Sequence, residues 1–174
     1  MDIETTRFGT VTVADERIIR FPKGLLGFPQ QTTFVLIESS DQAATEPADS
    51  DRYFWWLQSA DQPNLAFVVT DPSLFVRGYS VPVHPEQLAT LGMSSLDEAQ
   101  VFVIVNKTDQ SLTGNLQGPL VINVRDRCGE QLVLSDRRFT TRVPLMEVGA
   151  EPAPVVKTTA PAAPRGKKSA AAVA

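Results

Sequence analysis

The sequence predicts a mainly β protein, a small antiparallel β-barrel-like domain with one short helical element and a disordered C-terminal tail. Three observations support this fold class. Short apolar runs rich in β-branched residues recur between turn-forming residues, as in barrels and sandwiches. Only residues 85–91 combine several signals of a helix, and the composition changes after Gly149. Closing the strands into a barrel would remove the exposed edges that so strand-rich a chain must otherwise protect.

The first part of the chain contains five predicted strands, at residues 10–13, 17–21, 32–38, 53–58 and 65–69. Trp55 and Trp56 occupy successive positions of the fourth strand. Because successive side chains of a strand point to opposite faces, we expect one tryptophan in the core and the other on the far face. Residues 39–52 are polar and acidic and show no periodicity, which predicts a loop.

The predicted helix covers residues 85–91. Pro85 suits a first helical position, Glu86 complements the helix dipole, and Gly92 can end the helix. Residues 100–106 follow as an apolar run without alternation, so we expect a strand that is covered on both faces.

Residues 113–134 predict two strands around a turn, and the rest of the chain is organised around them. The two apolar runs lie at 120–124 and 132–134. Cys128 and Gly129 lie in the polar break between them, where glycine can supply the positive φ of a hairpin loop.

A bend is expected just before the first of these two strands. Asn115 and Gly118 flank it, and Pro119, which lacks a backbone N–H, fits where a strand begins. A last short strand is expected at residues 138–142.

The chain divides into a body and a tail by composition. Residues 150–174 contain nine alanines, four prolines and no aromatic residue, which cannot build a core. We therefore expect a folded domain over residues 1–149 and a disordered Ala/Pro/Lys-rich tail over residues 150–174. The tail carries a charge of +3, and since the whole chain carries −4, the body carries −7.

The charge and hydropathy of the chain limit its partners and its location. An acidic body argues against direct nucleic-acid binding and suits a basic protein partner. No apolar run approaches a membrane span, and the N-terminus has neither a basic region nor an apolar signal core. We expect a cytoplasmic protein that does not contact the membrane.

The chain lacks the residue combinations of an enzyme or a metal protein. Cys128 is the only cysteine and His84 the only histidine, so neither an all-cysteine nor a multi-histidine metal site exists. Arg125 and Arg127 could favour a Cys128 thiolate, but no histidine is nearby in sequence. We expect no catalytic residue, no metal and no cofactor, and a binding module in place of an enzyme.

Three ordered blocks of sequence resemble a known family. The first is Phe8-Gly9 with residues 18–28, the second Trp56-Leu57-Gln58-Ser59 with residues 65–72, and the third residues 115–123 followed by Gln131-Leu132-Val133-Leu134. Together they resemble FliW, the family of bacterial flagellar assembly factors. The resemblance covers residues 3–145 and implies a compact β-barrel-like domain. Two features depart from the family pattern. Pro29 occupies a position where the family often has an acidic residue, and the basic tail is an addition.

The resemblance also implies a function and two partners. It implies a flagellar assembly factor that binds flagellin and antagonises the translational regulator CsrA, which relieves repression of flagellin synthesis. We expect a monomer when the protein is free. The expected partner-binding residues are Leu25, Phe28, Trp56, Asn115 and Pro119. The alternative is a flavin-binding split-barrel oxidoreductase, although no phosphate-binding cluster stands out.

Overall fold

The computed structural model describes residues 1–38 and 53–147 of the 174-residue chain. The acidic loop predicted at residues 39–52 and the tail predicted at residues 150–174 therefore lie outside the described residues. The mainly β fold class is confirmed.

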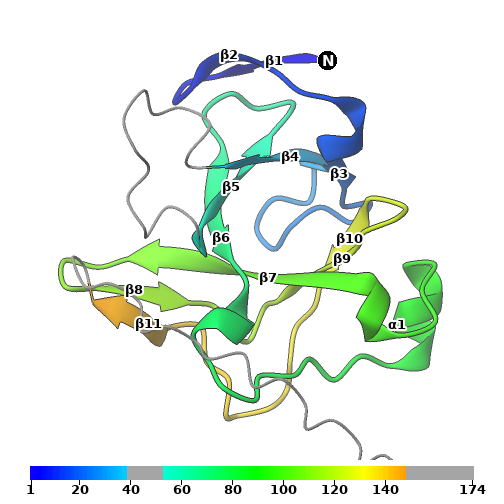
Figure 1. Ribbon diagram of the computed structural model, residues 1–174, viewed down its shortest axis with the longest axis vertical. Helices are drawn as coiled ribbons and strands as arrows, with labels where there is room; N and C mark the ends of the chain where they lie inside the picture. The colour runs from blue at the N-terminus through cyan, green and yellow to red at the C-terminus, as the bar shows by residue number, and fades with distance from the viewer. Residues whose placement is uncertain (39–52, 148–174) are drawn as a thin grey trace, which may run out of the picture.

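Strands dominate the described residues, and they form two sheets (Figure 1). The strands are β1 (Asp2–Thr5), β2 (Gly9–Thr12), β3 (Ile18–Arg20), β4 (Thr33–Glu38), β5 (Trp55–Ser59), β6 (Ala66–Thr70), β7 (Ala99–Lys107), β8 (Ser111–Gly114), β9 (Leu120–Asn123), β10 (Cys128–Gln131) and β11 (Val143–Glu147). The only α-helix in this part of the chain is α1 (Pro85–Thr90), and short 3-10 turns occur at Asp15–Arg17, Pro72–Leu74 and Leu96–Glu98.

The larger sheet closes on itself as a barrel. Its strand order is β11-β8-β7-β6-β5-β4-β3-β10-β9, and an additional pairing of β7 with β9 completes the ring. The long strand β7 pairs with three strands, because its first half pairs with β9 and its second half pairs with β6 and β8. The strands β8 and β11 form an arm beside the barrel, and the β1–β2 hairpin lies over one end (Figure 1).

Three apolar clusters hold these layers together. The barrel interior contains Ile19, Phe21, Leu25, Phe34, Leu57, Val69, Phe102, Leu120 and Ile122. A second cluster joins the α1 region to the outer face of β7 and β9, and it contains Val81, Leu91, Met93, Val121, Leu132 and Leu134. A third, of Ile3, Val13, Val35 and Ile37, attaches the β1–β2 hairpin to β4. The strand predicted at residues 100–106 is thus covered on both faces, as expected.

The hairpin of β9 and β10 differs from the prediction in where its second strand begins. The second strand is Cys128–Gln131, and Cys128 pairs with Asn123. Residues 132–134 follow this strand and extend its pairing, since the Leu132 and Leu134 N–H groups donate to the Pro119 and Gln117 carbonyls. The positive φ of the turn belongs to Arg127, at 54°, and not to Gly129. Gly129 is required for another reason, because a Cβ there would lie 2.7 Å from the Phe21 ring. The predicted placement of Cys128 and Gly129 in the turn was wrong.

Two further expectations about strands need correction. Among the described residues the last strand is β11, and residues 138–142 instead form turns and irregular backbone. A strand at Asp2–Thr5 was not predicted. Its two buried residues, Ile3 and Thr5, alternate with exposed ones, but the run is too short to stand out in the sequence.

Candidate functional site

A tight loop between β3 and β4, residues 22–29, presents apolar side chains at the surface. The backbone of Leu25 and Phe28 closes it, since the Leu25 N–H donates to the Phe28 carbonyl at 3.3 Å and the Phe28 N–H to the Leu25 carbonyl at 2.7 Å. Gly24 and Gly27 both have positive φ. The loop separates its apolar residues: Leu25 is 3% exposed, whereas Leu26 is 58% exposed and Phe28 is 37% exposed.

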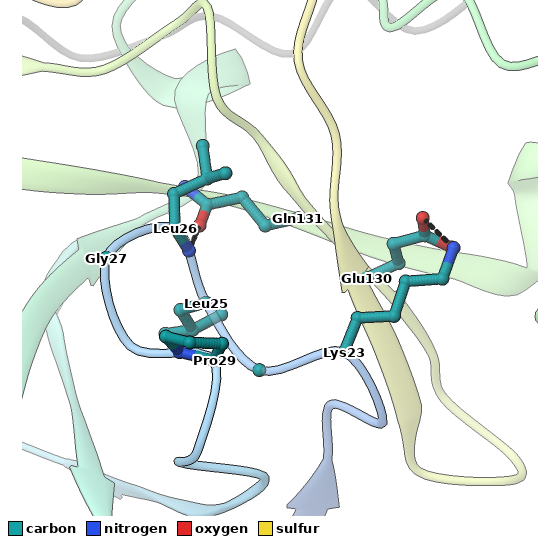
Figure 2. A pocket seen from close by; sticks show the side chains of 8 residues that line it. Lys23, Leu25, Leu26, Gly27, Pro29, Glu130 and Gln131 are labelled. Carbon is teal, nitrogen blue, oxygen red and sulfur yellow. Dashed lines mark hydrogen bonds and ion pairs between the residues drawn. The ribbon is translucent and has the colours of Figure 1, made fainter.

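The loop is attached to β10 by side chains. The Lys23 Nζ donates to the Glu130 Oε1 at 2.7 Å, and the Leu26 N–H donates to the Gln131 Oε1 at 2.8 Å. Figure 2 shows both bonds reaching from the loop to β10. Phe28 is fixed on its other side by an edge-to-face contact with Phe67 of β6, with ring centroids 5.3 Å apart. The exposed Leu26 is therefore carried by an anchored loop.

The predicted bend before β9 reaches the same place. The Asn115 Oδ1 accepts from the Gly118 N–H at 3.0 Å, which closes the bend locally. The Gln131 Nε2 donates to the Gly118 carbonyl at 3.1 Å. Pro119 is buried where β9 begins, as its missing N–H predicts. Gln131 thus joins the loop to the bend, and we call residues 22–29, 115–119 and 130–131 the loop–bend surface.

Trp56 lies outside the loop–bend surface. The Arg7 guanidinium carbon lies 4.2 Å from the centroid of the Trp56 ring, and Phe8 meets the ring edge-on at 5.8 Å. Trp55 points to the other face of β5 and packs on Phe102 in the barrel interior. The two tryptophans take opposite faces, as expected, and Trp56 serves to attach the N-terminal hairpin.

Four of the five predicted partner-binding residues therefore lie together, and their side chains have different exposures. Phe28 is exposed and Asn115 is half-buried, whereas Leu25 and Pro119 are buried, so these two shape the surface from below. The sequence reasoning did not select Leu26 or Gln131 individually. Because Leu25, Leu26 and Phe28 are all apolar, the sequence does not show which of them is exposed. Gln131 stands out only as the polar residue before the apolar run that ends at Leu134.

The Cys128 thiol lies beside this surface, because Cys128 lines a small hollow with Pro22, Lys23 and Glu130. Burial raises the pKa of the half-buried Cys128, and the charges of Asp126 and Glu130 raise it further, against a smaller opposing effect of Arg20. A raised pKa disfavours the thiolate that a nucleophile requires. His84 precedes α1, where its N–H donates to the Gln87 Oε1 at 2.9 Å.

Within residues 1–38 and 53–147, no group of three or more His, Cys, Asp or Glu residues is placed to hold a metal ion. The same residues contain no helix long and apolar enough to span a membrane. The loop–bend surface itself combines exposed apolar groups, backbone polar groups and one ion pair. This composition suits contact with a polypeptide.

Comparison with known proteins gives consistent matches over the described domain. The FliW family, described as FliW protein, matches residues 2–145. A flagellar assembly factor FliW from Heliobacterium modesticaldum is 38% identical over 144 residues, which is 82% of this chain and 88% of the relative. Another from Leptospira biflexa is 34% identical over 148 residues, covering 83% of this chain and 91% of the relative. A crystal structure of a flagellar assembly factor FliW superposes with a TM-score of 0.71 at 28% identity, covering 86% of this chain and 100% of that one.

Proposed function

Since the chain belongs to the FliW family of flagellar assembly factors, we propose that it binds flagellin and antagonises the translational regulator CsrA. While flagellin is abundant inside the cell, it occupies the assembly factor. When flagellin is scarce, the released factor binds CsrA and relieves repression of flagellin synthesis. Such a switch is a competition between linked binding equilibria, and it needs surfaces and no chemistry.

Family membership is the observation that carries this proposal. The exposed apolar residues of the loop–bend surface support it, because Leu26 at 58% exposure and Phe28 at 37% are held out on an anchored loop. Aromatic and aliphatic side chains of this kind are common anchors of protein interfaces. The partner-binding role of Phe28 is part of the proposal, and the bend at Asn115 supports it by shaping the surface from below.

The charge of the chain supports the second partner. The body carries a charge of −7, which suits association with a basic RNA-binding protein such as CsrA and disfavours direct contact with nucleic acid. Long-range attraction of this kind weakens as salt screens it. Binding of CsrA should therefore weaken with rising salt more than binding of flagellin through apolar contacts.

Isothermal titration of the full chain with monomeric flagellin tests the first partner. We expect a complex close to equimolar. The chain preloaded with CsrA should then release it when flagellin is added, as followed by size-exclusion chromatography. An absence of heat and of co-elution at micromolar concentrations would reject flagellin binding, and a stable ternary complex would reject the competition.

The cytoplasm is the compartment in which both partners would be met, and we propose that the protein works there as a monomer when free. The flavin-binding split-barrel oxidoreductase considered above is disfavoured by the family match. A yellow purified protein with flavin absorbance would revive it.

A further inference from the structure

The barrel is closed by unusually little backbone pairing between β3 and β10. These two strands run parallel and pair only at Arg20 and Cys128, whereas every other neighbouring pair around the barrel matches over three or more positions. Pro22 has no N–H, so the ladder cannot continue from β3. Among the described residues, no backbone hydrogen bond connects residues 22–29 to β10. We call this gap the seam.

Beyond Cys128, β10 directs backbone polar groups into the seam. The Leu132 N–H donates to the Pro119 carbonyl at 2.9 Å, on the β9 side. Neighbouring residues of an antiparallel strand direct their N–H and C=O groups to alternate sides, so those of Gln131 face the seam. The Arg127 carbonyl belongs to the same alternating set as Gln131 and points to the same side, where it accepts from the Arg20 N–H across the seam at 2.8 Å. Gln131 thus presents the hydrogen-bonding pattern of an edge strand.

Two side-chain bonds span the seam where the ladder stops. One joins Lys23 to Glu130, whose side chains are 69% and 17% exposed, and the other joins the Leu26 N–H to the Gln131 side chain. Both are visible in Figure 2. An ion pair with so exposed a lysine is weak, and neither bond belongs to the barrel ladder. These two bonds can therefore break while the barrel keeps its ladder of backbone hydrogen bonds and Leu25 keeps its place in the interior.

The seam also offers space and apolar surface. A hollow of about 280 Å³ lies between the loop and β10, and Leu25, Leu26 and Pro29 contribute to its apolar lining. Val133, two residues after Gln131, is 64% exposed. Lys23 and Glu130 neutralise each other at the rim, so no net charge selects for a charged partner there. A peptide strand with small or β-branched apolar side chains matches these features.

From these features we propose that the seam takes up an extended, uncharged segment of flagellin as an added strand on the β10 edge, next to Gln131. The exposed tip of the loop at Leu26 shifts aside while Leu25 stays in the barrel interior, and an apolar side chain of the segment enters the hollow beside Leu26. The identity of the partner rests on the proposed function, whereas the place and the mode of binding rest on the seam itself.

Hydrogen–deuterium exchange and titration on the full chain test this proposal together. Adding monomeric flagellin should slow exchange of the Gln131 backbone N–H, followed residue by residue by NMR. Leu26→Asp should weaken flagellin binding at least about tenfold, because a carboxylate would enter an apolar contact. Val124→Asp is the matched control, since Val124 is also exposed, at 49%, and lies at the opposite end of the β9–β10 hairpin. It should bind flagellin as the unmodified chain does.

The outcomes separate this inference from the proposed function. If the unmodified chain does not bind flagellin, both fail. If it binds flagellin while the Gln131 N–H exchanges as before, or while Leu26→Asp binds normally, only the seam is wrong. If CsrA and not flagellin slows exchange of the Gln131 N–H, or if a higher concentration of the chain alone does so, the seam binds another occupant. Either result would overturn the proposal.

Discussion

Replacing Gly24 by alanine should open the loop that carries the exposed apolar residues. Gly24 has a φ of +66°, a conformation that costs an L-residue about 1–2 kcal/mol. A Cβ at this position would also lie 2.5 Å from the Phe28 carbonyl oxygen and 2.7 Å from the Pro29 Cα. Both neighbours are backbone atoms, so the clash can be relieved only by moving the loop.

The expected loss is the sum of these two effects. Alanine reduces the entropy of the unfolded chain, which offsets about 0.4–1 kcal/mol of the conformational cost. Forcing extra atoms into a packed place adds about 1–3 kcal/mol. We therefore expect Gly24→Ala to lower the free energy of unfolding by about 2–4 kcal/mol.

Gly27 provides the matched control within the same loop. Its φ is +84°, but a Cβ there would have no atom within 4 Å. Gly27→Ala should therefore cost only the conformational part, about 0.5–1 kcal/mol. In urea denaturation, with a slope of about 2 kcal/mol/M, the midpoint should fall by about 1–2 M for Gly24→Ala and by less than about 0.5 M for Gly27→Ala.

Equal midpoints for the two variants would refute this reasoning, because they would show that the backbone contact at Gly24 carries no cost. A large shift for both would mean that positive φ alone dominates. The same samples can be titrated with flagellin. Because Gly24→Ala displaces the loop that carries Leu26, it should weaken flagellin binding per folded molecule more than Gly27→Ala does.

Three further predictions follow from single side chains. Asn115→Ala removes the acceptor of the Gly118 N–H and should cost about 1–2 kcal/mol in chemical denaturation with unchanged flagellin affinity; normal stability with weakened affinity would instead make the bend a contact surface. Burial raises the pKa of Tyr79 to about 12, above the value of about 10 for an unfolded tyrosine, so stability should be steady below pH 9–10 and fall as the pH rises from about 10 to 12. Tyr79→Phe should flatten that alkaline decline, and an unchanged decline would show that another group causes it. Cys128→Ser and His84→Gln should each leave flagellin binding and motility intact, and a motility defect in a folded variant would point to chemistry at that residue.

Local patterns were sufficient for most elements of the barrel. The helix begins at Pro85 and is followed by Gly92, whose φ is +70°, as the proline and glycine signals predict. The bend at Asn115 closes through its own side chain, and β9 begins immediately after Pro119. Each of these features depends on residues within a few positions of one another, so the sequence displays its cause directly.

The errors in the β9–β10 hairpin have a common physical origin. Residues 132–134 look like the whole second strand because Leu132 and Leu134 are apolar, but these two side chains pack in the cluster near α1 and only extend the pairing that begins at Cys128. The strand that pairs with β9 contains Cys128, Gly129 and two polar residues, which its position in the sheet tolerates. A short apolar run can result from packing against a distant element or from pairing in a buried strand. The sequence pattern is the same in both cases, so only the tertiary structure distinguishes them.

By itself, the sequence determined the mainly β class, the bend at Asn115 before β9 and the resemblance to FliW. The tertiary structure decided the register of β10, the single bridge at Cys128 and the joining of the loop to the bend by Gln131. The Leu26–Gln131 bond connects residues 105 positions apart, and the Lys23–Glu130 pair 107. Propensity and periodicity report on neighbours along the chain, whereas such contacts exist only after the barrel has brought its two ends together.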